Sequence, residues 1–218
     1  MTKFCCKLVD KHVELLYNTR DNDNKEAFEL KLKEIANVQS GLVIARKKAL
    51  AESQIIKSYF QLNLTSVSKD GYIIKEALDV LNAKEIISDD YLTREGDIVV
   101  RLTAPYTAVY IEKKNEGIVV SSNFCLVRNV QSYSKEFLGY FLNCNAVKKY
   151  FSSNTQGSTI MNISNAVVEE ILIPTMDIKT QEWYSKILKL QIRKIEISEK
   201  ISECESRLLK QLLKKIEE

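Results

Sequence analysis

The chain has 218 residues, of which 45% are hydrophobic and 28% are charged, and its net charge is only +3. This composition is typical of a globular protein with its own core. It excludes nucleic-acid binding through overall positive charge, so any such affinity must come from a local patch. Five cysteines without a C-x-x-C pair indicate reduced thiols. Since we see no secretion signal and no membrane span, we expect a cytoplasmic protein.

The N-terminal region has a mixed helical pattern. The run "LVDKHVELLYN" has an apolar face, and "TRDNDN" interrupts it with turn-forming residues. We therefore predict a helical extension over residues 1–30. The next run, "FELKLKEIANVQSG", is also predicted to be helical and to end at Gly41.

From about residue 42 to 130 the pattern changes to short strands. "SYFQLNLTSV", "IVVRL", "AVYIE", "IVVSS" and "FCLVR" are rich in β-branched and aromatic residues, and turn signals such as "KDGY", "REGD" and "KKNEG" separate them. Residues 75–83 are predicted to form a short helix within this region. The spacing predicts an antiparallel, partly barrel-like sheet, with Cys125 in a buried strand.

Helices return after the sheet. Residues 134–151 have a continuous apolar stripe, and Ser134 is a suitable N-cap for one helix. Ser164 is expected to cap a short helix that leads to the apolar run ending at Pro174. We place the end of the domain near residue 175, so that the domain covers 31–175 and the fold class is α+β with flanking helices.

The longest predicted element follows, over residues 178–218, which contain no glycine or proline. A helix of this length extends about 60 Å, longer than one compact domain can cover. Its apolar stripe is Ile197, Ile201, Cys204, Leu208 and Leu212. A continuous stripe of this kind favours packing against another helix. We assign 176–218 to spacing and dimerisation, and expect Cys204 to be buried like a core residue.

The sequence contains few residues of the kinds that catalyse reactions or bind cofactors. His12 is the only histidine, and no glycine-rich phosphate-binding loop is present. Asp97, Glu112 and Lys114 match the D…E-x-K spacing of metal-dependent nucleases, in which two carboxylates hold Mg²⁺. Because this short pattern arises easily by chance in a highly charged chain, we predict no metal site and no catalytic residue, and keep the nuclease as a lesser alternative.

Several predicted loops instead carry hydrogen-bonding and basic groups. Lysine and arginine neutralise phosphates, while amides, hydroxyls and arginine read base edges in the major groove. The candidate DNA-binding residues are Arg46, Lys47, Lys48, Arg101, Thr103, Tyr106, Asn123, Gln156, Gly157, Ser158, Thr159 and Asn162. Any one of them alone is more simply a solvated loop residue, so the hypothesis depends on several loops acting together.

With these elements in order, the chain resembles the specificity subunit of type I restriction–modification systems. The resemblance covers about residues 31–218, from "KLKEIANVQSG" through "LTREGDIVVR" and "GIVVSSNFCLVR" to "QGSTIMNISNAVVEEILIP" and the glutamine that begins the long helix. The order and spacing of these segments carry the likeness, because no single motif is strong. The chain departs from the family pattern in having a single Pro174 before the helix and an unmatched segment at 1–30.

The resemblance implies a target recognition domain that contacts double-stranded DNA and a long helix that packs antiparallel with a second one. It implies no cofactor on this chain, since S-adenosylmethionine binds the partner methyltransferase subunit, and a restriction subunit is a further possible partner. With one domain and one helix, the chain looks like a half-size subunit that pairs with a second copy to read a palindromic bipartite site. The alternative is a non-catalytic coiled-coil adaptor whose β domain binds another protein.

Overall fold

In the computed structural model, residues 30–155 and 162–217 are described. Their centre is a four-stranded antiparallel sheet in the order β2-β7-β5-β6. Its strands are β2 (Asn37–Ser40), β5 (Ile98–Arg101), β6 (Ala108–Tyr110) and β7 (Phe124–Arg128). The residues of β7 are all buried, as expected for a central strand covered on both faces. This sheet positions the loops that connect its ends.

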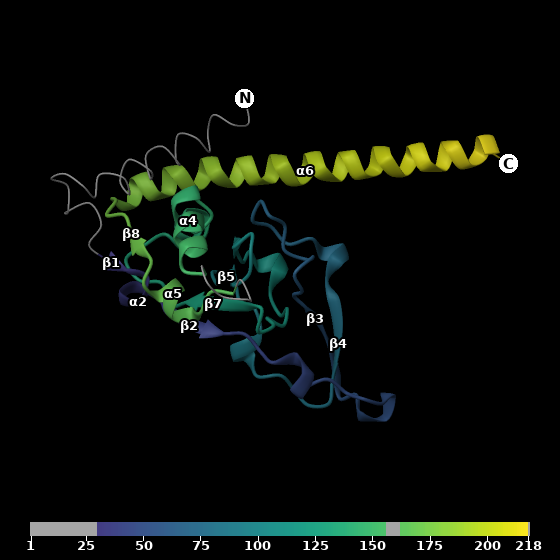
Figure 1. The fold of residues 1–218 in the computed structure, drawn as a ribbon, viewed down its shortest axis with the longest axis horizontal. Coiled ribbons are helices and arrows are strands. Elements are labelled where there is room, and N and C mark those ends of the chain that lie inside the picture. The colour runs from purple at the N-terminus through teal and green to yellow at the C-terminus, as the bar shows by residue number, and fades with distance from the viewer. Residues whose placement is uncertain (1–29, 156–161, 218) are drawn as a thin grey trace.

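Two smaller antiparallel pairs flank the central sheet. The β3–β4 ribbon consists of β3 (Lys57–Gln61) and β4 (Asp79–Ala83). The pair of β1 (Leu30–Lys31) with β8 (Leu172–Ile173) brings the beginning and the end of the domain together. Figure 1 shows the ribbon on the far side of the central sheet from β1 and β8.

Short helices cover the sheet. They are α2 (Leu32–Ile35), α3 (Lys135–Phe141), α4 (Asn145–Ser153) and α5 (Asn165–Glu169). Single 3-10 turns lie at η3 (Ile44–Arg46), η4 (Glu52–Gln54), η5 (Lys75–Ala77), η6 (Asp89–Tyr91) and η7 (Lys113–Asn115). Ser134 caps α3 as predicted, because its hydroxyl accepts a hydrogen bond of 3.2 Å from the Phe137 amide.

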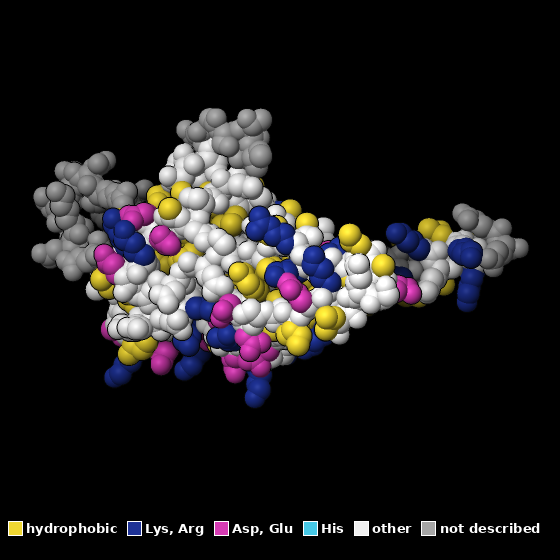
Figure 2. Space-filling view, turned by 90° about the horizontal axis from the view of Figure 1, so that it is seen from below, with side chains coloured by type: hydrophobic (Ala, Val, Ile, Leu, Met, Phe, Trp, Pro, Cys, Tyr) yellow, Lys and Arg dark blue, Asp and Glu magenta, His cyan; other side chains and the backbone are white. Residues whose placement is uncertain are grey.

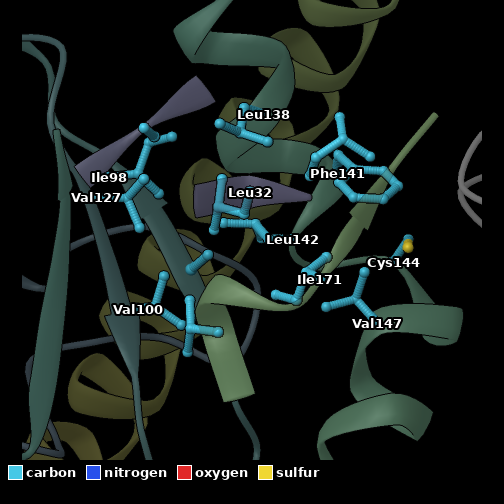
Figure 3. Close-up of a cluster of buried hydrophobic side chains, with 14 of the residues drawn as sticks. Leu32, Ile98, Val100, Val127, Leu138, Phe141, Leu142, Cys144, Val147 and Ile171 are labelled. Atoms are coloured by element: carbon cyan, nitrogen blue, oxygen red, sulfur yellow. The ribbon is translucent and has the colours of Figure 1, made fainter. Parts of the chain in front are cut away.

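The core lies on both faces of the central sheet. Successive side chains of a strand point to opposite faces, so Ile98 and Val100 pack with the helices while Val99 packs on the other face near Leu62. Figure 3 shows the helix-side cluster, where Leu138 and other helix residues meet side chains of the strands. A third cluster under the ribbon contains Tyr59 and Leu81.

The C-terminal helix α6 (Ile178–Glu217) contains 40 residues. Its first turns dock on the domain: the Gln181 side chain donates to the Met176 carbonyl at 2.7 Å and accepts from the Ser134 amide at 2.8 Å, and Leu188 is buried. Farther along, Glu199 accepts a hydrogen bond from Tyr72. The rest of α6 extends past the domain (Figure 1). No helix among the described residues is long and apolar enough to cross a membrane.

The predicted fold class is confirmed: an α+β fold with antiparallel sheets and a long C-terminal helix. Three local predictions were wrong. The region 31–41 is β1, the four-residue α2 and β2 in place of a helix. Residues 75–83 form η5 and then β4, since Leu81 and Ala83 alternate into the core. Cys204 is exposed, whereas Cys125 is buried as expected.

The predicted helix over 134–151 is divided into α3 and α4. Between them, the Asn143 side chain accepts a hydrogen bond from the Ala108 amide at 2.9 Å and donates to the Ala108 carbonyl at 2.7 Å. These two bonds engage both backbone groups of Ala108, the first residue of β6, and fix the chain at the break. The predicted extension over 1–30 lies outside the described residues except for Leu30.

Candidate nucleic-acid interface

Three loops that are far apart in sequence meet at the end of β5. The Leu102 amide donates to the Asn123 carbonyl at 3.0 Å, and the Leu102 carbonyl accepts from the Ile163 amide at 2.9 Å. A β-bridge pairs Thr103 with Asn162. The side chains of Asn123 and Asn162 are exposed and Thr103 is half-buried. The fold thus brings four of the predicted site residues into one group, which we call the loop cluster (Arg101, Thr103, Asn123 and Asn162).

Arg101, the fourth member, is held by the domain itself. Its Nη1 donates to the Leu64 carbonyl at 2.9 Å and its Nε donates to the Thr103 hydroxyl at 3.0 Å. Partial burial lowers the pKa of Arg101 from its ordinary value. The guanidinium therefore ties the loop around Leu64 to the end of β5 and fixes the position of Thr103.

Among the predicted contact residues that the structure describes, Tyr106 alone is buried. It is only 4% exposed and its ring packs against Phe151 with the centroids 5.8 Å apart. Its hydroxyl donates to Thr155 at 3.3 Å. The turn at Pro105 directs this side chain into the helix-side core, so Tyr106 supports the loop cluster from beneath and does not face a ligand. Gln156, Gly157, Ser158 and Thr159 lie outside the described residues.

The second group lies beside the far end of the ribbon. The Lys84 amide donates to the Lys47 carbonyl at 2.9 Å, and the Ala49 amide donates to the Asn82 carbonyl at 2.8 Å, so this segment runs along β4. The group, which we call the basic edge, consists of Arg46, Lys47, Lys48, Lys57 and Lys84.

Two members of the basic edge, Lys57 and Lys84, were missed by sequence reasoning. Lys57 is the register partner of Ala83, and Lys84 follows that residue. Lys57 and Lys84 lie beside residues 46–48 because β3 pairs with β4, and no residue spacing in the sequence indicates this pairing. Lys47 forms an ion pair with Glu85, which lowers the pKa of that carboxyl. Seen from the side facing away from α6, Lys and Arg side chains are interspersed with acidic and hydrophobic ones (Figure 2).

The nuclease-like arrangement does not form. Asp97 is buried and makes a two-pronged ion pair with Arg128, at 2.8 Å from Nη2 and 3.0 Å from Nε. The Arg94 amide also donates to the Asp97 carboxylate at 2.8 Å. Glu112 instead pairs with Lys114 at 2.7 Å. Asp97 therefore joins β5 to β7, and no cluster of metal-ligating side chains exists among the described residues.

Together, the loop cluster offers amides and a hydroxyl, and the basic edge contains five cations, of which Lys47 is paired with Glu85. Such groups bind phosphates and read base edges, and they lack a nucleophile with an adjacent base.

A family model of the type I restriction modification DNA specificity domain matches residues 24–204 of the chain. A search of curated proteins found no match. Among solved structures, the HsdS subunit from Thermoanaerobacter tengcongensis aligns with a TM-score of 0.59 at 15% identity, over 87% of this chain and 49% of that one.

Two further structures show the same fold. The type I restriction-modification S subunit from M. genitalium aligns with a TM-score of 0.53 at 14% identity, over 95% of this chain and 52% of that one. A chain from a structure concerning complex assembly and conformational transition of the type I R-M system aligns at 0.57 and 13% identity, over 95% and 50%. The chain thus spans about half the length of these relatives.

Proposed function

Because the chain belongs to the family of type I restriction modification DNA specificity domains, we propose that it is a sequence-specific DNA-binding subunit. It directs a partner methyltransferase to a bipartite site. In this proposal residues 31–175 read the DNA and residues 176–218 set the spacing and pair with a second copy. We assign no role to residues 1–30.

The observation that carries the proposal is the convergence of three separate loops on Leu102. Asn123 and Asn162 come from loops at opposite parts of the sequence, and backbone hydrogen bonds hold both beside Thr103. Exposed amides in a rigid backbone frame suit direct readout of base edges. We assign base reading to these residues and to the loop with Gln156, Ser158 and Thr159, with Gly157 allowing close approach.

Two further assignments follow. Arg101 holds the loops in position, since two of its nitrogens are bound within the domain. The basic edge contacts phosphates, which adds affinity without sequence preference.

We propose no catalytic residue on this chain. The two carboxylate-containing candidates are used in ion pairs within the domain. Methyl transfer, with its S-adenosylmethionine, would belong to the methyltransferase partner, and cleavage to a restriction subunit where one joins the complex. A protein that reads cellular DNA acts where that DNA is, so a cytoplasmic location is part of the proposal.

The second copy would pack on α6. Ile197, Ile201, Leu208 and Leu212 are between 44% and 56% exposed, and Cys204 lies on the same stripe. An apolar stripe on a helix that leaves its own domain is typical of a coiled-coil partner. Two identical domains related by a two-fold axis would read a palindromic bipartite sequence.

The test is to select bound duplexes from a random-sequence pool with the full chain and its methyltransferase partner. We expect one bipartite, palindromic motif. Replacing Asn123 or Asn162 with alanine should relax the preference at one position, by about 1–3 kcal/mol. Lys48→Ala should weaken binding to all sequences alike and reduce the salt dependence. A pool that returns no preferred sequence would refute the proposal.

The adaptor alternative makes the opposite prediction for salt. DNA binding through several phosphates weakens steeply as the salt concentration rises, because counterions are released on binding. A protein–protein contact made by the β domain through apolar groups would show little of this response, and it would persist in the Lys48→Ala variant.

A further inference from the structure

The outward face of the β3–β4 ribbon exposes an apolar pair. In each strand, alternate side chains point into the domain, where Tyr59 and Leu81 are 7% and 1% exposed. Their neighbours Phe60 and Val80 are register partners on the opposite face, and they are 60% and 61% exposed. Two adjacent apolar side chains exposed on the outer face of a ribbon form a candidate binding surface.

Polar groups continue this face along the ribbon. Ser58 and Asn82 are the next register pair on this same face, two residues along each strand. The Ser58 hydroxyl donates to the Asn82 side-chain oxygen at 2.8 Å. That bond orients the amide, whose nitrogen has no partner within the part of the chain that the structure describes. The face therefore has an exposed apolar pair, Phe60 and Val80, next to the Asn82 amide nitrogen, a hydrogen-bond donor whose orientation is fixed.

The ribbon also joins the two groups described above. At one end Lys57 and Lys84 belong to the basic edge. At the other end, the chain runs on from β3 to Leu64, whose carbonyl accepts the hydrogen bond from Arg101 of the loop cluster. The apolar pair thus lies between the proposed phosphate contacts and the proposed base readers, on one connected piece of the domain.

We propose that this outward face is itself a DNA-reading surface, with the ribbon entering the major groove of the duplex. Phe60 and Val80 contact apolar base edges such as the thymine methyl group, and the Asn82 amide donates to a base acceptor. A two-stranded ribbon has the width that the major groove admits. This inference rests on the proposed function and adds to it an element, with specificity residues, that the sequence did not single out.

Charge favours DNA over a protein as the occupant. Residues 44–61 and 79–86, which make up the ribbon and its flanking segment, contain five cations, the basic edge, against three acids, Glu52, Asp79 and Glu85. The balance of +2 compares with +3 for the whole chain, so most of the net positive charge lies here. A docking site for the methyltransferase subunit is the competing occupant, and the experiment separates the two.

The first measurement uses the full chain and a labelled random-sequence duplex pool. We expect Phe60→Ala to bind the motif that the parent chain selects about fivefold or more weakly, and to select a motif with a weakened preference at one or two positions. The matched control is Ile178→Ala, which removes a side chain exposed to a similar degree (50%) in the docked first turn of α6, outside the apolar stripe that would pair with a second copy. It should change affinity less than twofold. Because both side chains are exposed, thermal unfolding of the two variants should match that of the parent.

The second measurement places the photo-crosslinker p-benzoylphenylalanine at position 60 or 178, in the presence of both the duplex pool and the methyltransferase partner. We expect crosslinks to DNA from position 60 and none to DNA from position 178. Crosslinks from position 60 to the methyltransferase alone, or an unchanged affinity and motif for Phe60→Ala, would overturn the inference. If the unmodified chain selects a motif and Phe60→Ala selects the same one, only this inference fails. If the unmodified chain selects none, the proposed function fails as well.

Discussion

The domain and the projecting part of α6 place their apolar side chains in opposite environments. In the domain, Leu138, Phe141 and Val127 are at most 1% exposed and belong to one cluster on the helix side of the sheet. Beyond residue 197 of α6, Ile201 and Leu208 are more than half exposed. The same chain therefore contains one region that completes its own core and one that does not. Since burial of apolar surface drives both folding and association, the second region points to a partner.

Within α6 burial decreases along the helix: it is deepest in the first turns, Glu199 is still partly buried, and residues 200–216 are all exposed. Gln181, Ser185 and Leu188 are buried against the domain, although two of the three are polar. Hydrogen bonds make this possible, because the Gln181 side chain is bonded at both ends and the Ser185 hydroxyl donates to the Gln181 carbonyl at 2.8 Å. The first turns are thus fixed by specific polar contacts, and the projecting part keeps its apolar stripe uncovered.

The largest change in the mass of the assembly is expected for Ile201→Asp, which places a charge in the stripe. If two copies pair there, burying the carboxylate should weaken association by about 3 kcal/mol or more, roughly a hundredfold. Mass measured by light scattering should fall to that of the single chain. Ser206→Asp is the control, since it adds the same charge roughly 140° around the helix. An unchanged mass for Ile201→Asp would exclude pairing through this stripe.

The second prediction concerns the buried core of the domain, in contrast to the exposed stripe of α6. Phe141→Ala removes a fully buried ring from the helix-side core, and we expect it to lower the free energy of unfolding by about 3–5 kcal/mol. Chemical denaturation of the full chain measures this. Leu208→Ala, on the exposed stripe, is the comparison and should leave the unfolding of the domain almost unchanged. Equal effects for the two variants would mean that the stripe is buried against the domain.

Asp97→Ala tests how the domain uses its buried charges. Removing this carboxylate leaves Arg128 buried without its partner, so we expect a loss of about 3–5 kcal/mol in the free energy of unfolding. Addition of Mg²⁺ should not shift the melting temperature of the parent chain. A Mg²⁺-dependent shift that disappears in Asp97→Ala would restore the nuclease alternative that the ion pair argues against.

The two regions also differed in how well their sequence predicted them. The forty-residue helix was predicted almost to the residue, because its periodicity is continuous and no glycine or proline interrupts it. In the domain, residues 75–83 looked helical, yet β4 forms because pairing with β3 buries Leu81 and Ala83. Register partners are distant in sequence, and local propensity does not contain them.

The same reason limited the prediction of the site. Arg46, Lys47 and Lys48 stand together in the sequence and were found there, whereas Lys57 and Lys84 join them only through strand pairing. Tyr106 was assigned to the surface because it follows a proline in a turn. The backbone there has a positive φ of 51° and directs the ring inward onto Phe151, which no pattern of residue types reveals.

The smallest effect is expected at the hydrogen bond from Tyr72 of the domain to Glu199, far along α6 from its docked first turns. Burial, followed by this hydrogen bond, raises the pKa of Tyr72 from 10 to about 12. Its contribution to docking is therefore complete below pH 10 and is lost as the pH rises through about 12, when a tyrosinate would face the carboxylate.

Tyr72→Phe should keep the fold and the melting temperature while α6 loosens beyond Leu188. Distances between spin labels at positions 69 and 210 should then spread in the variant at neutral pH, and in the parent only toward pH 12. An equally narrow distribution in Tyr72→Phe would mean that the docked first turns alone fix the direction of α6. The angle of the helix, and the spacing that it sets between two domains, would then depend on Gln181 and its neighbours.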